Sequence, residues 1–117
     1  MSQGIQLFVY PVKDLTRAKT LYSQWLGVKP YVDGPYYVGY RVGDQEIGLD
    51  PNGHRTVQTG PLGYRDVDDI HSALQSLLDA GGETQQAIRD VGGGMLIATV
   101  KDADGNVIGL RGLRQNP

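Results

Sequence analysis

The spacing of apolar and polar residues along the chain predicts two helices. Residues 15–26 and residues 70–80 both carry apolar side chains at the three-to-four spacing of a single helix face. Asp14 and Asp69 precede these segments, where a short carboxylate can accept hydrogen bonds from the backbone N–H groups of the first turn. A glycine follows each segment, which is typical of a helix end. We expect the apolar stripe of the first helix to lie in the core, and it consists of Leu15, Ala18, Leu21, Tyr22, Trp25 and Leu26.

Short segments with the composition of strands surround the two helices. One strand is expected before each helix, near Leu7 and near Leu62. Turn sequences at Gly43-Asp44 and Asp102–Asn106 separate further strands. The strands expected after the helices are residues 36–42, 45–49, 83–88, 95–101 and 107–111. These segments number seven, and we expect about eight strands in all.

The second half of the chain repeats the order of the first half. The offset is 62 − 7 = 55 residues, and the aligned pairs are Leu7 with Leu62, Val12 with Val67, Asp14 with Asp69 and Gly27 with Gly82. The closing segments, Glu46–Leu49 and Val107–Leu110, align under an offset of 108 − 47 = 61. We therefore expect a single domain over residues 1–117, made of two modules at about 5–50 and 61–113 that are joined by a connection at 51–60.

Composition and charge exclude several classes of protein. The 117 residues suit one small domain, and no apolar run approaches the roughly 20 residues of a membrane span. The chain has no cysteine, which excludes disulfides, thiolate catalysis and zinc–thiolate sites. The formal charge of −2, from 11 basic and 13 acidic residues, offers no basic footprint for nucleic acid. Because the N-terminus also lacks the pattern of a signal peptide, we expect a cytoplasmic protein.

Two motifs resemble those of a known family. Val12–Leu15, followed by Leu26-Gly27, is similar to the first-module signature of the vicinal oxygen chelate superfamily, which includes glyoxalases, bleomycin-resistance proteins and dioxygenases. Val67–Ile70 and Asp102–Leu110 resemble its second-module signature, although Ala103 stands where a proline is usual. The resemblance implies an α+β fold in which two βαβββ modules form a curved, cleft-lining mixed sheet. It does not imply one activity, because the superfamily contains isomerases, lyases, dioxygenases and non-catalytic drug binders.

The resemblance also implies where a metal ion would be held. Enzymes of this superfamily generally bind a divalent ion with four His, Glu or Gln side chains, taken from the first and last strand of each module. The positions that match in this chain are Leu7, Gly48, Leu62 and Gly109, and none carries a donor side chain. We therefore expect no metal site and no cofactor.

A displaced metal site remains open at this point. It would use His54, Glu46 or Asp50. His54 lies in the connection, where a solvated histidine is the simpler interpretation. The other histidine, His71, is expected on the exposed side of the second helix.

Alternation along the strands identifies side chains on the face that the resemblance assigns to the cleft. On the middle strands of the second module, the side chains on this face are Ile97 and Thr99. An apolar and aromatic surface with a few charges is typical of a small-molecule pocket. The candidate ligand-binding residues are Leu7, Val9, Tyr37, Arg41, Glu46, Gly48, Leu62, Tyr64, Asp66, Gly109 and Arg111.

Three functions are compatible with these residues. The first is a metal-independent protein that binds, and so sequesters, an antibiotic or an aromatic metabolite. The second is a lyase, isomerase or dioxygenase of the superfamily, with a displaced metal or with acid–base chemistry by Asp66, Tyr64 or Arg111. The third is a regulatory domain without turnover.

The expected partner besides a small molecule is a second copy of the chain. In short members of the superfamily the facing modules commonly come from different chains, and the resemblance implies a homodimer here. The connection at 51–60 is long enough for the modules of one chain to sit side by side. The residues that would then face each other across two chains are Tyr37, Arg41 and Glu46 on one and Tyr64, Asp66 and Arg111 on the other.

Overall fold

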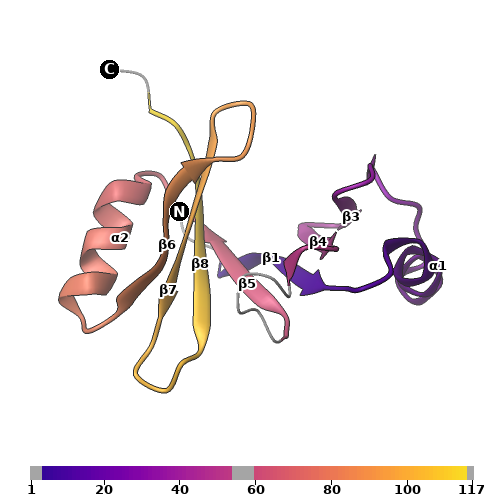
Figure 1. Cartoon of the computed structure of the whole chain (residues 1–117). Coiled ribbons are helices and arrows are strands. Elements are labelled where there is room, and N and C mark those ends of the chain that lie inside the picture. The colour runs from indigo at the N-terminus through magenta and orange to yellow at the C-terminus, as the bar shows by residue number, and fades with distance from the viewer. Residues whose placement is uncertain (1–3, 54–59, 116–117) are drawn as a thin grey trace. The chain divides into compact units, whose positions relative to one another are not determined.

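The structure is a computed structural model that describes residues 4–53 and 60–115. These ranges contain two helices and eight strands, in the order β1–α1–β2–β3–β4–β5–α2–β6–β7–β8 (Figure 1). The elements group into two compact units. The first unit covers Gln6–Gly63, and the second contains the residues from Tyr64 onward together with those up to Ile5. No helix in the described ranges is long and apolar enough to cross a membrane.

The first unit places one helix against a four-stranded sheet. The strands lie in the order β2-β3-β4-β1. β1 and β4 are parallel, whereas β3 is antiparallel to both β2 and β4. The elements are β1 (Ile5–Pro11), α1 (Leu15–Leu26), β2 (Val32–Asp33), β3 (Val38–Val42) and β4 (Gln45–Asp50).

Alternate residues of β3 and β4 form the core of this unit beneath α1. Val38, Tyr40, Ile47 and Leu49 are buried, and the helix residues packed against them are Leu15, Ala18, Tyr22 and Leu26. Asp14 begins the helix, because its side chain accepts a hydrogen bond from the Arg17 backbone N–H. Gly27 ends it in the left-handed conformation that glycine adopts without strain.

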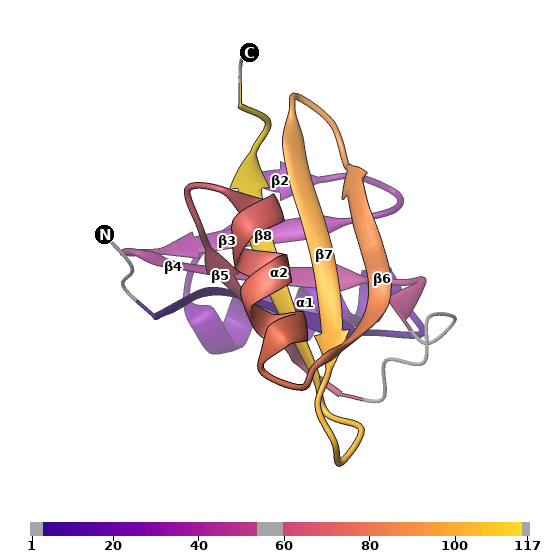
Figure 2. The same ribbon diagram turned by 90° about the vertical axis from the view of Figure 1, so that its left-hand side faces the viewer.

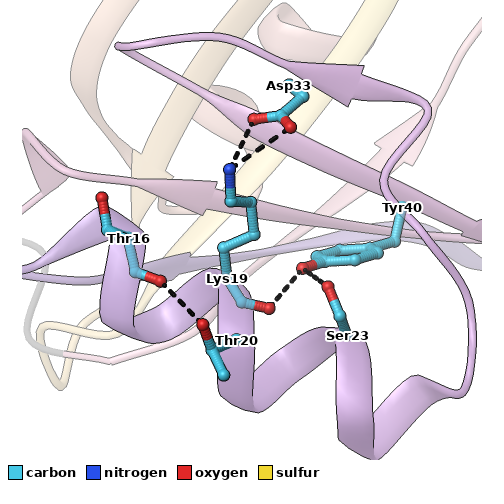
Figure 3. Close-up of polar contacts among 6 residues, drawn as sticks. All are labelled: Thr16, Lys19, Thr20, Ser23, Asp33 and Tyr40. Atoms are coloured by element: carbon cyan, nitrogen blue, oxygen red, sulfur yellow. Dashed lines mark hydrogen bonds and ion pairs between the residues drawn. The ribbon is translucent and has the colours of Figure 1, made fainter.

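The hydroxyl of Tyr40 ties β3 to α1. Tyr40 is fully buried, and its hydroxyl donates to the Lys19 carbonyl oxygen over 3.1 Å and lies 2.8 Å from the Ser23 hydroxyl (Figure 3). The Lys19 ammonium bonds to Asp33 over 3.1 Å, which links α1 to β2 as well. The polar group of the largest core side chain is therefore satisfied, as a buried hydroxyl requires.

Leu21 and Trp25 correct the expected core of α1. Leu21 is 66% exposed and Trp25 is 65% exposed, so neither belongs to the core. At 3.6 residues per turn, Leu21 lies roughly 100° around the helix from the centre of the buried stripe, and Trp25 lies at its flank. Trp25 instead meets the ring of Tyr22 edge-on, with the ring centroids 5.9 Å apart.

The second unit repeats the arrangement of the first. Its strands lie in the order β5-β8-β7-β6, with β5 parallel to β8 and the other pairs antiparallel. α2 packs on β6, β7 and β8 (Figure 2). In the core of this unit, Ile70 of α2 clusters with Leu96, Ala98 and Leu110 of the sheet. The elements are β5 (Leu62–Asp66), α2 (Ile70–Asp79), β6 (Glu83–Asp90), β7 (Met95–Lys101) and β8 (Val107–Leu113).

Asp69 begins α2 through several hydrogen bonds. One carboxylate oxygen accepts from the backbone N–H groups of His71 and Ser72, and the other accepts from the Ser72 hydroxyl over 2.9 Å. These bonds, led by those from Ser72, lower the pKa of the Asp69 carboxyl. The role predicted for Asp69 from the sequence is therefore confirmed.

The expected α+β fold of two βαβββ modules is confirmed, with differences at the ends of strands. β3 begins at Val38, so Tyr36 and Tyr37 lie outside it, in a turn closed by a hydrogen bond from the Gly34 N–H to the Tyr37 carbonyl oxygen. β8 continues two residues beyond the predicted end at Arg111. The two-residue strand β2 had no periodicity by which to predict it.

Candidate functional site

In the first unit, the candidate residues on β1, β3 and β4 share the face that α1 does not cover. Across the parallel ladder Leu7 pairs with Glu46, and Val9 pairs with Gly48. Across the antiparallel ladder Arg41 also pairs with Glu46. Residues that pair across a ladder point to the same face of the sheet, and their neighbours in sequence point to α1. The structure therefore brings these five candidates of the first unit together.

Tyr37 covers two glycines on this face. Its hydroxyl and the adjoining ring atoms occupy the space that a Cβ on Gly48 would take. Its Cε2 atom would lie only 3.1 Å from a Cβ on Gly39, the Cα partner of Gly48. The two glycines thus form a flat floor, and the tyrosine ring lies on it.

Tyr31 belongs to the same face, although the sequence did not identify it. Its hydroxyl donates to a Glu46 carboxylate oxygen over 2.9 Å, and the Arg41 guanidinium carbon lies 4.2 Å from its ring centroid. Burial, followed by the hydrogen bond to Glu46, raises the pKa of the Tyr31 hydroxyl. Tyr31 lies before β2 in a segment without alternation, so no sequence pattern assigned it to a face.

The second unit shows the same relationship between a tyrosine and a glycine. Tyr64 on β5 is the Cα partner of Gly109 on β8, and its Cγ, Cδ2 and Cε2 atoms occupy the space of a Cβ on Gly109. Tyr64 is only 7% exposed. Thr99 pairs with Gly109 from the other side and bonds to the Gln85 side chain over 2.5 Å.

Asp66 and Arg111, both candidate residues, form an ion pair on the same face. The Arg111 Nε atom donates to one Asp66 oxygen over 2.6 Å, and a terminal nitrogen donates to the other over 2.9 Å. Such a two-bond pair fixes the orientation of both groups. The Arg111 side chain is 12% exposed and that of Asp66 is 47% exposed, so the carboxylate is the more accessible partner.

A hollow of about 380 Å³ adjoins this ion pair at the end of β8. Gln115 closes one side, where its amide donates to the Asp68 carbonyl oxygen over 2.8 Å. Arg114 bonds to Asp90, which is not part of the lining, over 3.1 Å. The charged and apolar side chains that line the hollow include Asp66, Asp68, Met95, Arg111, Leu113 and Arg114.

The four positions that the resemblance marks as metal ligands do not fit a metal ion. Leu7 and Leu62 are buried apolar side chains, and tyrosine rings lie against Gly48 and Gly109. Across residues 4–53 and 60–115, no group of three or more His, Cys, Asp or Glu side chains is placed to hold an ion. The residues present therefore offer carbon atoms and aromatic rings where the superfamily's enzymes place nitrogen and oxygen donors.

The displaced metal site has little support among the described residues. Glu46 accepts the bond from Tyr31, and Asp50 accepts one from the Asn52 backbone N–H over 2.8 Å. His54 lies outside the described residues. His71 is exposed on α2, as the sequence predicted.

Comparisons with known proteins agree on the fold. The family model of the Glyoxalase/Bleomycin resistance protein/Dioxygenase superfamily matches residues 4–110, whereas no curated protein sequence matches the chain. A methylmalonyl-CoA epimerase from Mycobacterium tuberculosis is 18% identical, with a TM-score of 0.70 over 97% of this chain and 90% of that chain.

Two further solved structures are similar over most of their length. One is a glyoxalase/bleomycin resistance protein/dioxygenase superfamily member from Vibrio splendidus 12B01, which is 15% identical with a TM-score of 0.69, over 92% of this chain and 96% of that chain. The other is described as a NAD-dependent benzaldehyde dehydrogenase from Legionella pneumophila, and is 14% identical with a TM-score of 0.74, over 92% and 98%. At these identities the likeness shows a shared fold alone.

Proposed function

Because the chain belongs to the Glyoxalase/Bleomycin resistance protein/Dioxygenase superfamily, we propose that it binds a small molecule without the help of a metal ion. The ligand would be an antibiotic or an aromatic metabolite that the protein sequesters. The protein would act in the cytoplasm as a homodimer. These finer statements are proposals that follow from the family and from the residues on the open faces of the two sheets.

One observation carries the proposal. In each module, the glycine at the mapped ligand position of the last strand lies beneath a tyrosine ring. The rings come from different elements, since Tyr37 precedes β3 and Tyr64 lies on β5. The repeat partner of Tyr64 is Val9, because 64 − 55 = 9. A tyrosine ring thus lies over the glycine in both modules, although the two tyrosines stand at different positions of the repeat. This supports a role for the ring itself.

The side chains around the two rings suit the binding of an organic molecule. Tyrosine supplies a flat apolar surface and a hydroxyl that can orient a ligand. Tyr31, Arg41 and Glu46 add an aromatic face and two charges beside Tyr37. Asp66 and Arg111 add an ion pair on the face that holds Tyr64. Mostly apolar linings with a few fixed polar groups are typical of small-molecule sites.

A thermal-shift screen tests the proposal. A compound that binds only the folded protein raises its unfolding temperature, and at 100 times its Kd the gain is about 2.7 kcal/mol. We expect some aromatic compounds to raise the midpoint equally with EDTA and with added Zn²⁺ or Ni²⁺. Stabilisation that disappears in EDTA and returns with metal would contradict metal-independent binding.

Substitutions of two neighbouring tyrosines, Tyr36 and Tyr37, form a matched pair for testing the compounds that the screen identifies. Tyr37→Ala removes the ring that lies on Gly48 and should weaken binding by about 1–3 kcal/mol. Tyr36→Ala removes a side chain that is 75% exposed and should leave affinity unchanged. Equal effects of the two substitutions would remove Tyr37 from the proposed site.

A further inference from the structure

We propose that one exposed flank of α1 docks on the surface of an anionic lipid bilayer. The flank consists of Arg17, Leu21 and Trp25, on the helix that covers the sheet face opposite the candidate ligand site. Three observations carry the inference. They are the exposure of two large apolar side chains, the absence of such side chains from the second module, and the excess of basic residues around the helix.

Leu21 and Trp25 expose apolar surface to water on this flank. They are 66% and 65% exposed, and a spacing of four residues makes them neighbours on the helix surface. The half-buried Tyr22 supports Trp25 from the side of the core, since its ring meets Trp25 edge-on and lies 5.2 Å from the ring centroid of Tyr10. The flank is thus an apolar projection backed by packed aromatic rings.

The second module shows that the fold does not need these apolar side chains. At the repeat offset of 55, Leu21 corresponds to Ser76, and Trp25 corresponds to Ala80. Both residues of the second module are exposed, and α2 packs on its sheet without a large apolar group at either position. The exposed pair on α1 therefore has no counterpart in the packing that the two modules share.

The residues around α1 carry an excess of positive charge. Between positions 13 and 31, Asp14 is the single acidic residue, and the basic residues are Lys13, Arg17, Lys19 and Lys29. Lys19 pairs with Asp33, and Asp14 caps the helix. Within residues 4–53 and 60–115, the other three basic side chains form no ion pair. Because the whole chain carries a formal charge of −2, this is a local concentration of positive charge, which complements an anionic surface.

A bilayer fits the flank better than another protein surface or a second copy of the chain. A specific protein interface buries about 800 Å² on each partner, whereas one tryptophan buries about 150–250 Å². Pairing two copies of α1 would also bring the basic residues of both chains together. A fluid bilayer needs no complementary pocket, and tryptophan and leucine beside basic residues are typical of helices that lie at a membrane surface.

The fluorescence of Trp25 and co-sedimentation with vesicles test the proposal. Trp25 is the single tryptophan of the chain, so its emission reports on this flank. The full chain is mixed with vesicles of phosphatidylcholine, with vesicles of equal parts phosphatidylcholine and phosphatidylglycerol, or with soluble polyglutamate. We expect the emission to shift to the blue with the anionic vesicles, because the ring leaves water.

Co-sedimentation measures the strength of binding. Each basic side chain near an anionic surface strengthens binding about fivefold. We therefore expect co-sedimentation with the anionic vesicles to be about tenfold stronger, or more, than with phosphatidylcholine alone. Added salt should reduce this preference, since it screens the attraction.

Three variants give the flank the residues of the second module. They are Arg17→Ser, Leu21→Ser and Trp25→Ala. Arg17→Ser should weaken binding to the anionic vesicles about fivefold. Each of the other two should weaken it by about fivefold or more, because less apolar surface leaves water. The matched controls are Leu113→Ser, at a leucine that is 63% exposed, and Lys101→Ser, at an exposed lysine of β7, and both should leave binding unchanged.

Each result decides the inference. A preference for anionic vesicles that all three flank variants weaken, and that the controls retain, supports it. No binding to anionic vesicles, equal binding to both kinds of vesicle, unchanged binding in the flank variants, or an equal loss in the controls overturns it. A blue shift with polyglutamate as large as that with vesicles also overturns it, and would assign the flank to an acidic protein surface.

Discussion

The ring of Tyr64 lies against Gly109, its Cα partner in the parallel ladder between β5 and β8. The ring atoms nearest to the glycine include Cγ, which cannot move away without moving the whole side chain. Tyr37 lies over Gly48 in a different way, because only its hydroxyl end occupies the space of a Cβ. The two sites therefore differ in how firmly the ring is held.

Replacing each of the two glycines by alanine should show which tyrosine ring is held more firmly. Gly109→Ala should lower the free energy of unfolding by about 1–3 kcal/mol, because the added methyl group displaces a buried ring. Gly48→Ala should cost less, since the half-buried Tyr37 can rotate away. Gly34→Ala is the control, as its nearest non-neighbour atom would be 3.6 Å from the new Cβ. Urea unfolding measures all three, and a Gly109→Ala variant as stable as Gly34→Ala would contradict the contact.

The Tyr40 hydroxyl gives a second test of the first unit. Tyr40→Phe should cost about 1 kcal/mol or slightly more, because it leaves the Lys19 carbonyl and the Ser23 hydroxyl without this partner inside the protein (Figure 3). Tyr36→Phe is the matched control, since Tyr36 is exposed and contributes no core contact. Urea denaturation of both variants should show a loss for Tyr40→Phe alone. An equal loss of stability in the two variants would show that the Tyr40 hydroxyl bonds do not stabilise the fold.

The parts of the structure that the sequence predicted are those that depend on local periodicity. The helices at 15–26 and 70–79 follow from a three-to-four apolar spacing with aspartate caps. Alternation along the strands assigned Arg41, Glu46, Asp66 and Arg111 to the open faces of their sheets. The strand registers that pair Arg41 with Glu46 and Asp66 with Arg111 came from the structure.

The parts that the sequence missed depend on how far around a helix the sheet makes contact, and on side chains that come from loops. A helical wheel shows that Leu21 and Trp25 are apolar, but not how far around the helix the sheet reaches. Tyr31 joins Glu46 from a loop, and Tyr37 turns onto Gly48 from just before β3. The hollow at the end of β8 required knowing that β8 continues to Leu113.

The cap of α2 predicts a dependence of stability on pH. The pKa of Asp69 in the folded protein is lowered from its ordinary value of 3.8, so its charge stabilises the fold above that pH. This contribution is lost as the pH falls below 3.8 and through the lowered pKa. The gap in unfolding free energy between the wild type and Asp69→Asn should therefore be constant near neutrality and close in acid. A constant gap for Asp69→Asn from neutral to acid pH would refute the assignment.

The expected homodimer stays a prediction. Light scattering should give the mass of two chains at micromolar concentration. Tyr64→Ala should leave that mass unchanged while weakening ligand binding by about 1–3 kcal/mol. Circular dichroism must first show that this variant is folded, because Tyr64 is buried. A monomer that still binds ligand with full affinity would reject a cleft shared between two chains.

Metal content tests the central claim most directly. The purified protein is incubated with Zn²⁺, Ni²⁺, Mn²⁺ or Fe²⁺, desalted, and analysed for bound metal in parallel with its unfolding temperature. With Leu7 and Leu62 buried and tyrosine rings over Gly48 and Gly109, we expect far less than one ion per chain and no shift on adding EDTA. About one ion per chain, together with a midpoint that falls in EDTA, would contradict the account and make a metal enzyme the better explanation.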